Sequence, residues 1–193
     1  MRSDLTLGAW LAGAVVFHFV AASYAPQIGL PEMGQFYGVI LAYAVPASLG
    51  LWLAGWLKPW QAAGFAALVV AAHAIAVVAA ISTTPTMGLS AIKMMRSGAL
   101  AGVLGAGLSL FGLIGLRGRP TLGAFALAAG FSLVLALCGL LLVPALDAPQ
   151  LPKELALPLI LYLPWQIVFS VAVALIARPS RSAVRLSPEP ARS

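Results

Sequence analysis

Charged side chains are scarce in this sequence of 193 residues. Lysine, arginine, aspartate and glutamate together make up 8% of it and hydrophobic residues 62%, and the mean hydropathy is +1.01. Soluble domains carry about 25% charged residues, so the composition excludes a compact water-soluble domain and predicts an integral membrane protein with several spans. The basic residues are scattered between apolar runs and form no dense patch, which excludes nucleic acid as a partner.

Residues that carry most enzyme chemistry are also few. A single cysteine, Cys138, excludes an intrachain disulfide and a thiolate metal cluster. The five carboxylates all fall in expected linkers, helix ends or the C-terminal tail, which argues against a buried carboxylate relay. No serine stands in a GxSxG context. The sequence therefore favours a protein that is not an enzyme.

Long apolar runs are abundant. Six segments have the roughly 20 apolar residues that are needed to cross a hydrocarbon core of about 30 Å. They lack the alternating pattern of a membrane β-barrel, and a span in lipid must satisfy its own backbone hydrogen bonds, so each is predicted to be a helix. The predicted fold is all-α, a polytopic membrane bundle of six transmembrane helices over residues 5–23, 36–56, 60–81, 97–116, 122–143 and 155–177.

Basic residues divide the linkers into two sets. Eight of the eleven lie in linkers and ends on one side of the expected bundle, and Lys93, Arg96 and Lys153 lie on the other. Because cytoplasmic loops are richer in lysine and arginine, we expect a multi-pass protein of the plasma (inner) membrane with both termini in the cytoplasm. Residues 180–193 are rich in serine, proline and arginine and predict a disordered cytoplasmic tail. As an alternative, Ser23-Tyr24-Ala25 has the small-x-small form of a cleavage site, which would make the first span a signal peptide.

Turns of the form basic residue plus proline suggest an internal repeat. Lys58-Pro59, Arg119-Pro120 and Arg178-Pro179 stand at intervals of about 60 residues. The segment Thr6 to Trp10 also matches Thr121 to Phe125 at four positions of five. We therefore expect a transmembrane domain of residues 1–179, built as three helical hairpins over 1–57, 58–118 and 119–179. The alternative is that spans rich in alanine, glycine and leucine look alike by composition.

The two histidines of the chain occupy one register of this repeat. When the three repeats are aligned, His18 and His73 fall at the same position. The third repeat has Leu133 at that position, next to Ser132. An ionisable residue at this depth should face the bundle interior. Three roles stay open: hydrogen bonds that tighten packing, a polar path for a solute or proton, and joint ligation of a b-type haem or a transition metal.

The second helix of each predicted hairpin carries a helix breaker followed two positions later by a polar residue. Tyr43 and Tyr162 precede the two proline breakers and add hydroxyl groups at the same depth. Interrupted helices at mid-membrane point to a solute site in transporters, although a kink can also serve only to shape the bundle. The three pairs are Pro46 with Ser48, Gly107 with Ser109, and Pro164 with Gln166.

The fourth predicted span holds two further signals. Gly98, Gly102, Gly105, Ser109 and Gly112 form one smooth face, suited either to packing inside the bundle or to docking against a second copy or a partner subunit. Lys93 and Arg96 stand three residues apart at the mouth of the span, where they can contact a lipid phosphate or an anionic solute or serve as interfacial anchors.

The sequence thus yields three functional hypotheses. The first is a channel- or transporter-like bundle for a small neutral or weakly polar solute, which needs no cofactor. The second is a redox subunit that holds b haem between His18 and His73, and the third is a non-catalytic assembly or scaffold subunit. The residues expected along the path of the first hypothesis are His18, His73, Ser48, Ser109, Ser132, Gln166, Tyr43 and Tyr162.

Overall fold

The computed structural model describes residues 2–27, 32–83, 90–118, 120–146 and 148–178, and within these ranges the chain is helical apart from short turns, with no strand. The long helices are α1 (Arg2–Tyr24), α2 (Glu32–Leu53), α3 (Pro59–Thr83), α4 (Ala91–Arg117), α5 (Leu122–Gly139) and α8 (Leu163–Ala177). The shorter ones are the 3-10 turn η1 (Ala25–Gln27), α6 (Leu142–Leu146), α7 (Lys153–Leu157) and the π-helical turn η2 (Pro158–Tyr162). The predicted all-α fold is confirmed.

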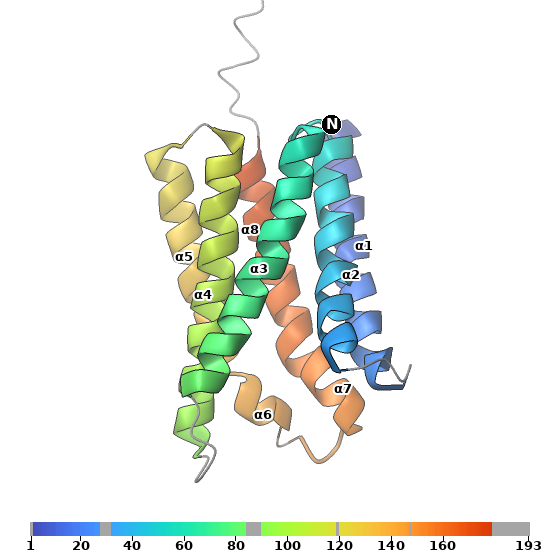
Figure 1. Cartoon of the computed structure of the whole chain (residues 1–193), viewed down its shortest axis with the longest axis vertical. Coiled ribbons are helices and arrows are strands. Elements are labelled where there is room, and N and C mark those ends of the chain that lie inside the picture. Colours follow the sequence, from blue (N-terminus) through green and yellow to red (C-terminus); the bar gives the residue numbers. More distant parts are fainter. Residues whose placement is uncertain (1, 28–31, 84–89, 119, 147, 179–193) are drawn as a thin grey trace, which may run out of the picture.

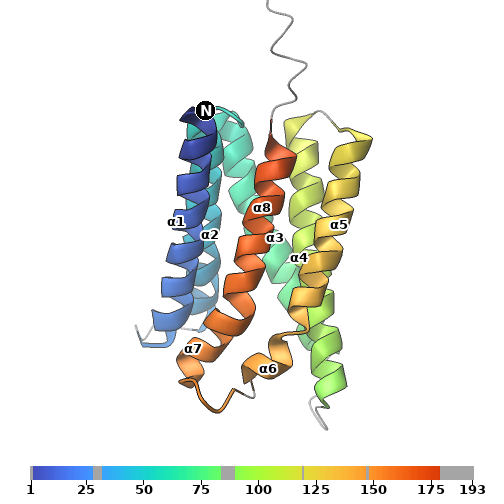
Figure 2. The same cartoon turned by 180° about the vertical axis from the view of Figure 1, so that it is seen from behind.

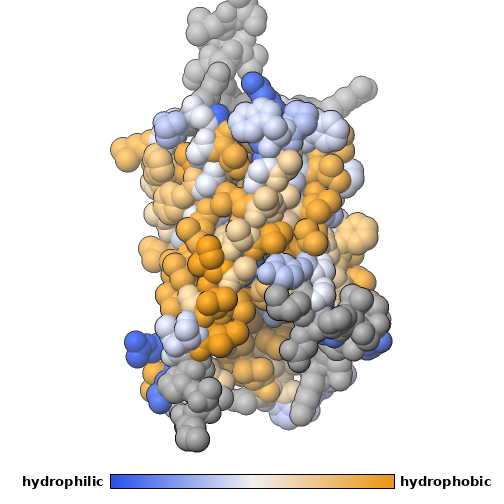
Figure 3. Space-filling view, in the orientation of Figure 1, coloured by the Kyte–Doolittle hydropathy of each residue, from blue (hydrophilic) through white to orange (hydrophobic). Residues whose placement is uncertain are grey.

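Six segments of the described chain are long and apolar enough to cross a membrane, as predicted. The fifth joins α5 to α6, and the sixth joins α7, η2 and α8. Large apolar side chains cover the outside, among them Leu122 at 87% and Ile92 at 70% exposure, and Figure 3 shows this apolar surface along the length of the bundle. Such a surface suits lipid tails and not water. The chain is an integral membrane protein with several passes.

Several helix boundaries differ from the prediction, and two of the differences have a clear local cause. The second helix ends at Leu53, because Gly55 adopts a left-handed φ of 74° that an α-helix cannot include. The fourth helix begins at Ala91 instead of residue 97, because the Ser90 side chain accepts a hydrogen bond from the Lys93 backbone N–H and caps the helix start. Lys93 and Arg96 therefore lie within the first two turns of α4.

The six spans form a closed ring in chain order. Each long helix packs against the next one along the chain, and α8 closes the ring by contacting both α5 and α1. Figures 1 and 2 show α8 between the α1–α2 pair and the α4–α5 pair, and α8 also contacts α4 across the bundle. This topology brings residues from α1, α2, α3, α4 and α8 to one interior space.

Small residues of α4 let its neighbours approach closely. A Cβ added at Gly98 would overlap the carbonyl oxygen of Gly139 on α5, and one added at Gly112 would overlap the Leu68 side chain on α3. Gly105 faces Ala76 of α3 at 3.4 Å. Packing within the chain therefore uses the Gly98 to Gly112 face, so these residues are not available as a docking face for a partner.

Both described ends of the chain lie at the same end of the bundle (Figure 1). Arg117 links two helices there, because its guanidinium donates hydrogen bonds to the carbonyl oxygens of Ile176 and Arg178 at the end of α8. Arg178 also lies 3.8 Å from the Asp4 carboxylate of α1. The bundle thus separates these cations from Lys93 and Arg96, in agreement with the predicted sorting; the side of the membrane on which each end lies stays a prediction.

The hairpin repeat also stays a prediction. Helices α1 with α2 and α3 with α4 pack as antiparallel neighbours, but α4 packs against α5 as extensively as against α3. In the third predicted repeat the position equivalent to the histidines is Leu133, whose side chain is 64% exposed on the outside. The tail of residues 180–193 and the turn residues Arg119 and Pro179 lie outside the described residues.

Candidate functional site: a buried polar cluster

Both histidines line one small internal cavity of about 20 Å³. Tyr43 of α2, Ser109 of α4 and Gln166 of α8 line it with them, so five of the predicted path residues meet at one place. The remaining lining is apolar and aromatic and was not predicted to line a site: Ile40, Val69, Gly105, Trp165 and Phe169. We call the five polar residues the polar cluster.

His18 is held in one neutral tautomer by its two hydrogen-bond partners. Its Nδ1 lies 3.0 Å from the carbonyl oxygen of Val39, and its Nε2 lies 3.5 Å from the amide nitrogen of Gln166. A carbonyl oxygen only accepts, so Nδ1 carries the proton, and Nε2 of the neutral ring then accepts from the Gln166 amide. His18 is 3% exposed, so this pairing supplies the partners that water would otherwise give to its ring.

This tautomer of His18 sets the orientation of the Gln166 side-chain amide. Because the Gln166 nitrogen faces His18, its Oε1 atom points elsewhere, and this oxygen is buried without a hydrogen-bond partner in the described structure. A buried acceptor without a partner costs about 1–3 kcal/mol. Gln166 lines the cavity, and a space of about 20 Å³ exceeds the roughly 10–15 Å³ that one water molecule requires. The cavity can therefore hold one very small molecule next to the Gln166 side chain.

Aromatic rings fix the orientation of the His18 imidazole. Tyr43 and Tyr162 present edges to it at centroid distances of 6.3 Å and 5.6 Å. The Tyr43 hydroxyl is in turn 2.9 Å from the hydroxyl of Ser170. Ser170 was not predicted, although it lies four residues after Gln166 and therefore on the same face of α8.

His73 occupies a different environment from His18. Its ring packs against Phe36 at a centroid distance of 5.5 Å, and no hydrogen bond joins it to another described residue. The residue is only partly buried. His73 is therefore the less buried of the two histidines, and no described residue holds its ring nitrogens by a hydrogen bond.

Ser109 contributes a hydroxyl group from α4. Its Oγ donates to the Gly105 carbonyl oxygen at 2.7 Å, one turn earlier in the helix. The proton is thus committed to the backbone, and the oxygen lone pairs remain able to accept. Ser109, which lines the cavity, can therefore accept a hydrogen bond but has no free proton to donate.

Three predicted path residues do not line the cavity. Ser132 donates to the Ala128 carbonyl oxygen at 2.7 Å and lies where α5 packs against Gly107 of α4. Ser48 is buried with no hydrogen-bond partner in the described structure, away from the cavity lining. Tyr162 contacts the His18 ring but is not part of the lining.

The three predicted helix breakers differ in their effect. Gly107 breaks nothing, because glycine keeps its N–H and α4 continues through it. Pro46 lies inside α2, where it cannot donate to the carbonyl oxygen four residues earlier. Pro164 follows the π-helical turn η2, in which the Leu163 N–H bonds to the Pro158 carbonyl oxygen. Such turns are frequent at functional sites, and Gln166 lies in the first turn of α8, which follows this one.

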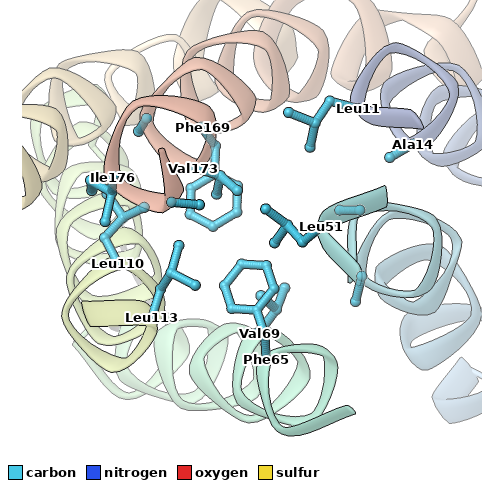
Figure 4. Packing of buried hydrophobic residues seen from close by; sticks show 14 of the residues in the cluster. Leu11, Ala14, Leu51, Phe65, Val69, Leu110, Leu113, Phe169, Val173 and Ile176 are labelled. Atoms are coloured by element: carbon cyan, nitrogen blue, oxygen red, sulfur yellow. The ribbon is translucent and has the colours of Figure 1, made fainter. Parts of the chain in front are cut away.

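A packed apolar core closes the bundle between the cavity and the end that carries the termini. Figure 4 shows Leu51, Phe65, Leu110, Leu113 and Val173 converging there from four helices. All five side chains are fully buried. We call these five residues the apolar plug; it leaves no space for a solute on that side in this conformation.

The geometry gives little support to a haem between the histidines. A porphyrin is many times larger than the cavity, and both ring nitrogens of His18 already have partners. No group of three or more metal-ligating side chains occurs among the described residues. The haem and scaffold alternatives stay predictions without a structural observation in their favour.

Lys93 and Arg96 do not belong to the polar cluster. Both are exposed and border a separate surface groove at the end of the bundle opposite the termini.

Comparison of the chain with protein-family models, with curated proteins and with solved structures gives no match.

Proposed function

We propose that this membrane protein binds a very small neutral solute at the polar cluster and passes it across the bilayer. The observation that carries the proposal is that Gln166, whose Oε1 is buried without a hydrogen-bond partner in the described structure, lines a small cavity between five of the helices. Packing alone would be served as well by an apolar residue, because an unpaired buried acceptor costs stability. A ligand that donates a hydrogen bond to this oxygen would explain why an amide is present at this position.

The cavity lining favours a neutral solute. None of the five polar cluster residues is a lysine, arginine, aspartate or glutamate, so nothing in the lining compensates an ion for its lost hydration. The acceptors Gln166 Oε1 and Ser109 Oγ favour a molecule with N–H or O–H donors. The volume of about 20 Å³ limits it to the size of water or ammonia in this conformation.

Passage requires the apolar plug to open. The described conformation is closed on the side of the termini, so transport needs the long helices to shift relative to one another. Pro46 in α2 and the π-helical turn before α8 each remove a regular backbone hydrogen bond close to the cavity. These are the positions at which α2 and α8 can bend at low cost.

Stopped-flow measurement of liposome permeability tests the proposal. Purified protein is reconstituted in liposomes, and the permeabilities to water, ammonia, formamide and glycerol are compared with those of protein-free liposomes of the same lipid. We expect increased permeability to the smallest donors and none to glycerol, because the cavity selects by size.

Two variants test whether the flux depends on the polar cluster. His18→Leu removes the acceptor that orients the Gln166 amide, and we expect the added permeability to fall at least about fivefold, the factor given by about 1 kcal/mol of lost interaction. Ser132→Ala is the matched control, because Ser132 is buried but does not line the cavity. Equal permeability of wild-type and protein-free liposomes for all four solutes would contradict the proposal.

A further inference from the structure

A groove lies on the surface of the described chain at the end of the bundle opposite the termini. It has a volume of about 620 Å³ and is bordered by α3, α4 and α5. Lys93, Arg96 and Thr83 stand at one end of it, and Leu100, Val103 and Leu133 line the part that extends toward the middle of the membrane. The groove is thus cationic at one end and apolar at the other.

The order of residues along α4 creates this polarity. Lys93, Arg96, Leu100 and Val103 follow each other at helical spacings of three and four, so they form one stripe on one face. At 1.5 Å per residue the stripe extends about 15 Å from Lys93 to Val103. That length carries it from the headgroup level well into the hydrocarbon layer.

The charge at the end of the groove has no protein counterpart in the described structure. No carboxylate lines the groove, and the one ion pair among the described residues, between Arg178 and Asp4, belongs to the opposite end of the bundle. The N-terminus of α4 adds positive partial charge within one turn of Lys93. Two exposed cations of this kind attract a phosphate group.

We propose that this groove binds one anionic phospholipid of the surrounding leaflet. Lys93 and Arg96 hold the headgroup phosphate, and an acyl chain lies along Leu100, Val103 and Leu133. An inorganic phosphate ion would use only the cationic end, whereas a phospholipid matches both the charge and the apolar length of the groove. Because a phospholipid fits both the cationic and the apolar end of the groove, we take the lipid and not the free ion as its occupant.

Native mass spectrometry of the purified full chain tests the site. The protein is released from micelles that hold equal amounts of phosphatidylglycerol and phosphatidylcholine, and the ratio of bound lipids is measured. We expect phosphatidylglycerol to dominate, and Lys93→Gln with Arg96→Gln to lower its excess about thirtyfold, since each cation near the surface contributes about 1 kcal/mol to anionic lipid binding. The control removes two cations from the other end of the bundle with Lys58→Gln and Arg178→Gln and should leave the excess unchanged.

A second pair of variants tests the acyl-chain half of the groove. Leu133→Trp fills the groove without changing charge, and Val134→Trp adds the same ring outside it; both positions are exposed, at 64% and 44%, so folding does not depend on them. We expect only Leu133→Trp to reduce bound phosphatidylglycerol. Equal binding of the two lipids by the wild-type chain would overturn the proposal. So would displacement of the lipid by excess inorganic phosphate together with no effect of Leu133→Trp, which would indicate an anion site alone.

Discussion

The amide nitrogen of Gln166 on α8 lies 3.5 Å from Nε2 of His18 on α1, although the two residues are 148 positions apart in the chain. This contact joins the sixth span to the first and closes the ring of helices through a polar interaction. The cavity is complete only when α8 has docked between its neighbours, since α8 supplies Trp165, Gln166 and Phe169. Formation of the site and closure of the fold are therefore the same structural event.

The stability of the bundle should depend on the glycines of α4 according to what each one faces. Gly98→Ala places a methyl group against the Gly139 carbonyl of α5, and we expect a loss of about 1–3 kcal/mol in unfolding free energy from overpacking. Gly115→Ala is the matched control on the same helix, because nothing lies within 4 Å of its added Cβ. There alanine should be neutral or stabilise by up to about 1 kcal/mol. Thermal unfolding in detergent measures both, and equal melting temperatures for the two variants would contradict the close packing of α4 with α5.

Ser109 of α4 and Ser132 of α5 are both buried but should respond differently to alanine. Ser109 and Ser132 each donate to the carbonyl oxygen four residues earlier at 2.7 Å, so Ser→Ala removes the same local bond at either site. Only Ser109 lines the cavity. We expect Ser109→Ala to change the permeability to water or ammonia by a factor of about two to five, the effect of roughly 0.5–1 kcal/mol, and Ser132→Ala to leave it unaltered. A larger change in Ser132→Ala than in Ser109→Ala would exclude the cavity from the solute path.

The orientation of the bundle can be tested with single cysteines, because replacing Cys138 by serine removes the only native thiol. Ser90→Cys and Lys58→Cys place exposed thiols at opposite ends of the bundle. With the termini in the cytoplasm, a membrane-impermeant maleimide added to intact cells should label Ser90→Cys at once and Lys58→Cys only after permeabilisation. The reverse labelling pattern would invert the predicted topology.

The number of spans and the sorting of charge between the two ends could be predicted from sequence, because both depend on one-dimensional quantities: the length of apolar runs and the positions of lysine and arginine. The convergence of His18 and His73 could also be predicted, since polar side chains in lipid must face the interior. His18 and His73 do line one cavity.

The composition of the cavity wall could not be predicted in the same way. Ser48, Ser109 and Ser132 share a depth and a residue type, but only Ser109 lines the cavity, because the rotation of each helix depends on packing with its neighbours. The role of Arg117 at the end of α8 was missed for a similar reason: its bonds to the Ile176 and Arg178 carbonyls join residues far apart in the chain. Gly107 was predicted to weaken α4, but the helix keeps its hydrogen bonds there.

Gln166→Met should separate the functional role of the polar cluster from its structural role. Methionine fills a similar volume and removes the unpaired buried oxygen, but it also leaves His18 Nε2 without its donor, so we expect the two effects to offset and the melting temperature to stay about the same. A marked fall in melting temperature would mean that the amide serves mainly to hold α8 against α1.

Stopped-flow permeability of liposomes that contain Gln166→Met, compared with the wild-type chain at equal protein density, tests the central claim most directly. If Oε1 of Gln166 receives the solute, the folded variant should lose the added permeability to water or ammonia by at least about fivefold, as expected for one lost hydrogen bond of about 1 kcal/mol. A variant that folds as well as the wild-type chain and conducts equally would contradict the assignment of the polar cluster as the solute site.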